Sequence, residues 1–123
     1  MNTPPIFTIC KNNTAVASYL QHDGLFNLYM AGAAPQNVVT PYAVWQVISG
    51  VPANYLGNRP DLERQRIQID VIADNVGMAK NIANAIEYAI ETSCHIDNYN
   101  GEWQNNDTKE WISSFDVIWM TKR

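Results

Sequence analysis

The most regular alternation of apolar and polar residues falls in the segment 41–71. Its first half, residues 42–49, contains no charged side chain, and its second half, residues 65–73, alternates with a period of two. A period of two is typical of a strand with one buried face. We therefore predict two long antiparallel strands, joined by the turn-rich loop 50–64, which is far longer than the usual hairpin loop of about two to five residues.

The strand predicted at residues 42–49 carries apolar side chains on both of its faces. Ala43 and Trp45 share one face, and Val44 and Ile48 share the other. Such a strand is either covered on both sides within its own chain or covered on one side by a neighbouring subunit. In both cases Trp45 is expected in the core.

Helical spacing of apolar residues is clearest at residues 76–91, where Asp74 or Asn75 is placed to cap the first turn. The apolar stripe consists of Ala79, Ile82, Ala83, Ile86, Ala89 and Ile90. Near the N-terminus the pattern predicts a short turn at residues 5–11 and a helix at residues 14–20.

The remaining strands are predicted at residues 25–31, 94–104 and 110–120, and the last two flank a turn and form a C-terminal hairpin. The final strand is apolar on both faces near its end, so we expect it to be covered on both sides. The order helix, three strands, helix, two strands predicts an α+β fold, with an antiparallel or mixed sheet and two helices packed on one face. A chain of 123 residues has the size of one domain, assigned here to residues 1–123.

The charge balance argues against tight nucleic-acid binding. The net charge is −4, and the 8 Lys and Arg residues are spread along the sequence without forming a cluster. Tight binding to a phosphate backbone requires basic groups that replace its counterions. Only 16% of the residues are charged, which favours a surface that packs against protein partners at a low desolvation cost.

Cys10 and Cys94 each lie in a mainly apolar segment, and we expect both to be reduced and buried. The N-terminal segment lacks the basic and apolar regions of a signal peptide, and no apolar run approaches the ~20 residues of a membrane span. We therefore expect no membrane partner, and folding in a cytoplasm.

No catalytic constellation is found. His22 and His95 stand without CxxC or HxxxH spacing, so no metal site is predicted. The acidic pairs in and beside the C-terminal hairpin turn, Asp97 with Glu102 and Asp107 with Glu110, are typical of solvated turns rather than of an acid–base pair. The sequence predicts no catalytic residues, no cofactor and no enzymatic activity.

Tryptophan is abundant in the C-terminal hairpin. Trp103 and Trp111 flank its turn and could pair across the strands, and Trp119 lies near the end of the final strand. Packing within the sheet explains them in the simplest way. The alternative is a subunit interface, where exposed tryptophans are enriched.

The predicted loop 50–64 combines apolar and charged side chains, which is typical of a docking arm. A loop folded back on its own domain would have the same composition, and both interpretations stay open. The residues predicted to form an oligomer or tube interface are Val51, Pro52, Tyr55, Leu56, Arg59, Asp61 and Arg64.

A family resemblance is carried mainly by PYAVWQVISGVPANYLGNRPD at residues 41–61. PPIF at residues 4–7, AP at 34–35, QIDV at 68–71 and SFDVIW at 114–119 also match. On these motifs the chain resembles the tail completion, or tail terminator, proteins of long-tailed bacteriophages and prophages. The resemblance covers nearly the whole chain.

The resemblance implies a small α+β structural protein without catalysis or cofactor. Such proteins assemble as a ring, commonly a hexamer, on the end of a finished tail tube. The ring stops tube polymerisation and offers a surface to the head-side connector, while DNA passes through its bore. The implied partners are other copies of the chain, the tail tube protein and the connector, and the implied location is the virion tail, assembled in the host cytoplasm.

Two alternatives remain open at this point. One is a different phage neck or minor tail component with the same fold. The other is a small ligand-binding or enzymatic α+β domain, which the abundance of aromatic residues could serve by lining a pocket.

Overall fold

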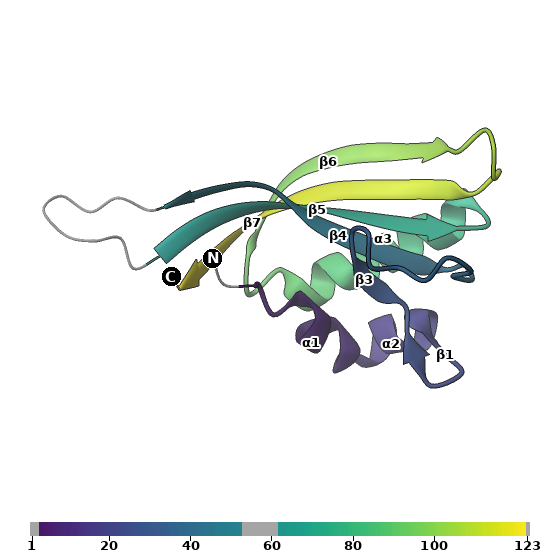
Figure 1. The fold of residues 1–123 in the computed structure, drawn as a ribbon, viewed down its shortest axis with the longest axis horizontal. Coiled ribbons are helices and arrows are strands. Elements are labelled where there is room, and N and C mark those ends of the chain that lie inside the picture. The colour runs from purple at the N-terminus through teal and green to yellow at the C-terminus, as the bar shows by residue number, and fades with distance from the viewer. Residues whose placement is uncertain (1–2, 53–61, 123) are drawn as a thin grey trace, which may run out of the picture.

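The computed structural model describes residues 3–52 and 62–122 and combines a curved sheet with helices (Figure 1). The helices are α1 (Ile6–Lys11), α2 (Thr14–Leu20) and α3 (Val76–Ile90). The main sheet contains β3 (Leu28–Met30), β4 (Tyr42–Pro52), β5 (Leu62–Ala73), β6 (His95–Gln104) and β7 (Trp111–Lys122). A separate two-stranded sheet contains β1 (Gln21–His22) and β2 (Leu25–Phe26). The α+β class predicted from the sequence is confirmed.

The strand order of the main sheet is β3-β4-β5-β7-β6. Only the β3–β4 pair is parallel, so the sheet is mixed, with antiparallel pairing elsewhere. The predicted order of elements was too simple in its first part. Residues 6–11 form a helix rather than a turn, which makes three helices instead of two among the described residues, and the strand predicted at residues 25–31 is divided into β2 and β3.

The central strand β5 pairs with β4 on one side and with β7 on the other. Its alternating residues Ile67, Ile69 and Val71 are fully buried, as the period-two pattern predicts. Helix α3 packs on β5 and β7, and α1 and α2 pack against α3 (Figure 1). The helices therefore cover the apolar side of β5 and leave the other side of the sheet open.

Strand β4 is covered on one side, so cover on both sides within the chain was a wrong prediction for the described residues. Ala43 and Trp45 are buried beneath the helical layer, whereas Gln46 and Ile48 are exposed. The open side follows from topology, because the three described helices pack on the other side. Cover by a neighbouring subunit stays a prediction.

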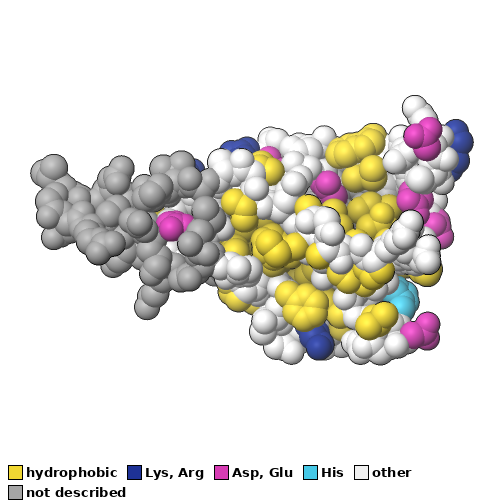
Figure 2. All heavy atoms as spheres, viewed as in Figure 1, with side chains coloured by type: hydrophobic (Ala, Val, Ile, Leu, Met, Phe, Trp, Pro, Cys, Tyr) yellow, Lys and Arg dark blue, Asp and Glu magenta, His cyan; other side chains and the backbone are white. Residues whose placement is uncertain are grey.

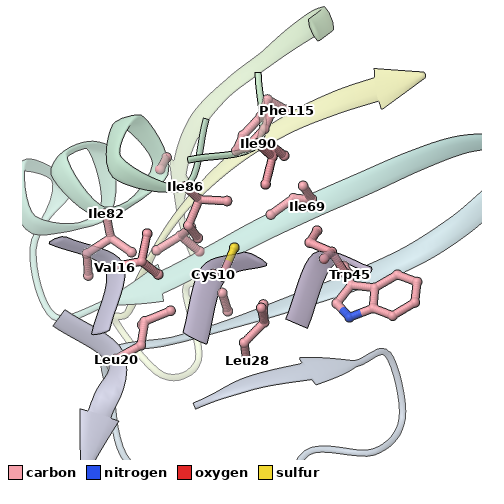
Figure 3. Close-up of a cluster of buried hydrophobic side chains, with 14 of the residues drawn as sticks. Cys10, Val16, Leu20, Leu28, Trp45, Ile69, Ile82, Ile86, Ile90 and Phe115 are labelled. Atoms are coloured by element: carbon pink, nitrogen blue, oxygen red, sulfur yellow. The ribbon is translucent and has the colours of Figure 1, made fainter. Parts of the chain in front are cut away.

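Helix α3 follows from an apolar stripe and a polar cap. The Asn75 side chain accepts a hydrogen bond of 2.8 Å from the backbone N–H of Met78, a cap of the kind that contributes about 1 kcal/mol. Figure 3 shows Ile82, Ile86 and Ile90 of α3 in the buried cluster. Full burial of each such side chain contributes about 1.5–3 kcal/mol of hydrophobic free energy.

The two cysteines lie where the N-terminal helices meet α3. Cys10 is fully buried in the core, Cys94 is half-buried at its edge, and both are free thiols. Burial raises the pKa of Cys10 to about 12 and the pKa of Cys94 to about 11. Both side chains therefore remain neutral and pack as small apolar groups.

Strand β7 is the most buried strand, with every residue from Ser113 to Trp119 shielded from solvent. It lies between β5 and β6 in the sheet. The predicted cover on both sides holds for residues 113–119 but not at the end of the strand, where Met120 is 47% exposed. Its partner β6 is an exposed edge strand with register shifts at Ile96/Asn98 and Tyr99/Gly101. Such bulges bend an edge strand and increase its twist.

Candidate functional site

The ends of β4, β5 and β7 run on past the helical layer and form a three-stranded projection, which we call the arm (Figure 1). The arm consists of residues 49–52, 62–66 and 118–122. Ser49 pairs with Arg66 and Val51 with Arg64, while Met120 pairs with Arg64 from the other side. Such a projection is supported along its length, because β5 pairs with β4 on one side and with β7 on the other.

The predicted interface residues fall in or next to the arm. Val51 and Pro52 belong to β4 rather than to a loop, so the predicted loop 50–64 was too long. Arg64 belongs to β5, is exposed, and is brought opposite Val51 by the strand register. The remaining four predicted residues, Tyr55, Leu56, Arg59 and Asp61, lie outside the described residues.

The open side of the arm combines apolar surface with a basic group. Met120 is 47% exposed next to Arg64, and a register shift between Val47 and Ser49 leaves Ile48 42% exposed. A shallow hollow of about 120 Å³ is lined by Ser49, Arg64, Arg66 and Ile118. Exposed Met and Ile beside Arg are typical of protein–protein contact surfaces.

Next to the arm, a polar cluster holds β6 against the rest of the sheet. Arg66 Nη2 lies 2.6 Å from Asp97 Oδ2 and 3.3 Å from Asp116 Oδ2. Asn100 donates to Asp116 Oδ1 at 2.9 Å and to Ser114 Oγ at 3.0 Å. The register shifts of β6 lie at Asp97 and Asn100 and turn both side chains toward this cluster. Its groups satisfy one another, so the cluster is structural.

The opposite side of the arm is buried although it is polar. Gln65 is fully buried and donates a hydrogen bond of 2.7 Å to Thr121 Oγ1, and Glu63 is 8% exposed. These residues were not predicted from the sequence, because the turn-rich pattern assigns Glu63 to a loop and the alternating pattern begins only at Gln65. Glu63 and Gln65 are separated by one residue at a strand end and therefore share a face. This spacing is the sequence pattern that could have indicated the buried polar side of the arm.

The tryptophans are mainly sheet residues. Trp45 and Trp119 are buried, which confirms Trp45 as a core residue. Trp103 lies opposite Ile112 and Trp111 opposite Gln104, so the two tryptophans at the hairpin turn are not direct cross-strand partners. Trp103 is 42% exposed on an edge strand, and its participation in a subunit interface stays a prediction.

Residues 3–52 and 62–122 contain no group of three or more His, Cys, Asp or Glu side chains that could hold a metal ion. His22 and His95 lie on different sheets, in β1 and at the start of β6. In the same part of the chain, no helix is long and apolar enough to cross a membrane.

At the sheet end opposite the arm lies a hollow that was not predicted from the sequence. We call it the connector hollow after the chain segment 31–41 that lines it, which is unrelated to the head-side connector of the phage. It measures about 290 Å³, and its lining residues are His22, Asp23, Leu25, Asn27, Tyr29, Pro35, Asn37, Val38 and Val39. Asn27 shapes it by donating to Val39 O at 3.3 Å and accepting from the Tyr29 hydroxyl at 2.8 Å. The bond to Val39 O holds the 31–41 connector next to Asn27, which lies between β2 and β3.

Comparisons with known proteins agree with this fold. The family model of the tail completion protein gp17 matches residues 4–100. A solved chain described as "Virion of native gene transfer agent (GTA) particle" is similar in structure, with a TM-score of 0.76 and 12% sequence identity over 96% of this chain and 92% of that chain. At that identity the likeness establishes the fold. A comparison with curated protein sequences gave no match.

The family match covers most of the chain and includes the β4–β5 region that carries the resemblance. The family match and the structural likeness to a chain of a virion particle are consistent with each other. The chain belongs to the tail completion protein gp17 family, and it is a structural component of a phage tail rather than an enzyme.

Proposed function

We propose that the protein caps the finished tail tube as an oligomeric ring. The ring stops further addition of tube subunits and presents a joining surface to the head-side connector. Its partners are other copies of this chain, commonly six in all, together with the tail tube protein and the connector. Assembly takes place in the host cytoplasm, and DNA passes through the bore without being tightly bound.

The observation that carries the proposal is the projecting arm. A tube cap must contact partners through surfaces that remain open on the folded subunit. The arm offers such a surface, because Arg64 and Met120 are exposed on it and Ile48 is exposed directly beside it. Arg64 makes no ion pair within the described part of the chain, so its charge is available to a partner.

The proposed interface is the arm together with the chain segment that joins β4 to β5. It comprises Val51, Pro52, Tyr55, Leu56, Arg59, Asp61 and Arg64. Apolar side chains would supply buried contact area, and the Arg residues would orient the contact through charge-assisted hydrogen bonds. No nucleic-acid-binding role is assigned, because the net charge of −4 disfavours tight contact with phosphates.

Tail assembly with the chain omitted tests the proposal. If the protein terminates the tube, electron microscopy will show tubes that continue beyond the normal length and fail to join heads. Supplying the wild-type chain will restore a single tail length. Tubes of normal length that nevertheless lack heads would instead favour a neck component with the same fold, and normal infectious particles would overturn both assignments.

A further inference from the structure

The connector hollow has the character of a contact site for a protein side chain. Leu25 and Val39 stand at it with 62% and 69% exposure, which is high for apolar residues. His22 Nε2 faces no solvent and finds no hydrogen-bond partner among the described residues. A volume of about 290 Å³ lies at the lower limit of the ~300–1,000 Å³ typical of small-molecule pockets, so one or two inserted side chains would fill it.

The hollow and the arm lie at opposite ends of the sheet (Figure 1). Strands β5 and β7 connect the two ends, because β5 runs from the arm at Leu62 to Ala73, and β7 returns from Trp111 to Lys122. The 31–41 connector is tied to the far end by the hydrogen bond from Thr40 Oγ1 to Asp74 Oδ1 at 2.6 Å.

The two ends also differ in charge. Asp23 lines the hollow, and the same end of the sheet carries Asp74, Asp107 and Glu110, with Lys109 as the basic residue of that turn. Figure 2 shows acidic side chains gathered at the end away from the arm. The arm instead carries the exposed Arg64, while Arg66 is already paired with Asp97 and Asp116, and Glu63 is nearly buried.

We propose that the connector hollow of one copy receives the arm of a second copy of this chain. The inference rests on the proposed ring and names the two surfaces that would close it. Met120 supplies apolar contact to Leu25 and Val39, and Arg64 approaches the carboxylate of Asp23. Repetition of this contact around an axis gives a closed ring.

A second copy is favoured over another occupant for a geometric reason. A ring requires two different surfaces on each subunit that complement each other head to tail. The arm and the hollow meet this requirement, because they lie at opposite ends and have complementary charge and complementary apolar character. Electrostatic complementarity of this kind fixes the register of an interface and suppresses incorrect pairings.

Charge-swapped variants test the contact. The arm variant is Arg64→Glu, and the hollow variant is Leu25→Lys, which places a like charge against Arg64 at an exposed position. Asp23→Asn removes the acidic partner and suits the local backbone, because Asp23 has a φ of 50° and Asn tolerates this conformation. Glu91→Lys, at the exposed end of α3, is the matched control for a change of charge.

Association is measured by sedimentation and native mass spectrometry up to about 1 mM chain, with thermal unfolding as the check on folding. The wild type and Glu91→Lys are expected to associate. Each single arm or hollow variant is expected to associate at least about tenfold more weakly, which corresponds to about 1.4 kcal/mol. An equal mixture of Arg64→Glu and Leu25→Lys is expected to recover association, because each arm then meets a hollow of suitable charge.

The remaining outcomes separate this contact from the proposed function. If the wild type associates and the variants do so equally well, or if the mixture recovers nothing, the contact is overturned while the ring stands. A wild type that remains monomeric up to about 1 mM also overturns the contact. Tube capping is then judged on its own by the tail-length experiment.

Discussion

Arg66 and Asp97 form an ion pair of 2.6 Å between Nη2 and Oδ2, although 30 residues separate them in the chain. The pair forms because a register shift in β6 displaces Asp97 from the regular ladder, toward the open side of the sheet. Arg66 also contacts the nearly buried Asp116 at 3.3 Å. One guanidinium therefore holds the edge strand and neutralises a buried carboxylate.

Replacement of Arg66 by Met is expected to lower the free energy of unfolding by about 1–3 kcal/mol, because Asp116 loses its cationic partner. Replacement of Asp97 by Asn is expected to cost less than about 1 kcal/mol, since the pair is partly exposed. Urea unfolding monitored by tryptophan fluorescence measures both. Equal losses for the two variants would show that Asp116 does not depend on Arg66.

Substitutions at two positions of α3 are expected to differ strongly in their effect on stability, because one position lies in the buried stripe and the other is exposed. Ile86 is fully buried, and Ile86→Ala is expected to destabilise the protein by about 2–5 kcal/mol, through lost burial and the cavity left behind. Tyr88 is 74% exposed, and Tyr88→Ala is expected to change stability by about 0.5 kcal/mol or less. Chemical unfolding of the two variants side by side checks this, and similar losses would contradict the observed packing of α3.

The protein is expected to lose stability at high pH, because the buried Cys10 thiol must then ionise. Burial raises the pKa of Cys10 from 9.0 to about 12, so folding favours the neutral thiol. The stabilisation is fully present below pH 9.0, the value for the unfolded chain, and is lost as the pH rises toward about 12.

The urea midpoint is therefore expected to fall as the pH rises above 9.0. Tyrosines ionise in the same range, so the informative comparison is with Cys10→Ala at each pH. That variant is expected to show a shallower decline. If the urea midpoints of the wild type and the variant fall in parallel, ionisation of Cys10 is not a cause of the lost stability.

Tyr55 and Arg59 lie in the segment that joins β4 to β5, outside the described residues. Their simultaneous replacement by Ala is expected to leave the monomer folded and to impair ring formation or tube capping, because both belong to the proposed interface. Circular dichroism measures folding, and electron microscopy of tails measures capping. Tails of normal length and infectivity with this double variant would exclude both residues from the interface.

The sequence predicted best those elements whose signal is local and repeated. Ile67, Ile69 and Val71 alternate along β5, and the stripe of α3 repeats with helical spacing, so both elements were found close to their true bounds. Turn-forming residues misled the analysis at Gly50 and Pro52. Pairing with β5 extends β4 through both positions, because ladder hydrogen bonds outweigh weak local preferences.

The candidate contact surfaces were harder to predict, because they depend on residues that are distant in the chain. The connector hollow is shaped by the hydrogen bond between the side chain of Asn27 and Val39 O. The polar cluster depends on two register shifts in β6, which no local sequence pattern indicates. Arg64 was predicted from the sequence as an interface residue, whereas its neighbour Met120 was not. Their pairing becomes visible only once β5 and β7 are aligned.

The proposed function requires that this protein forms a ring at one end of the finished tail tube. Cryo-electron microscopy of purified tails, with the chain carrying a small exposed tag, tests it most directly. If the protein caps the tube, a ring of this chain will be seen on the head-proximal end of every tube of finished length. Finished tubes without the chain at that end, or with the chain distributed along the tube, would contradict it.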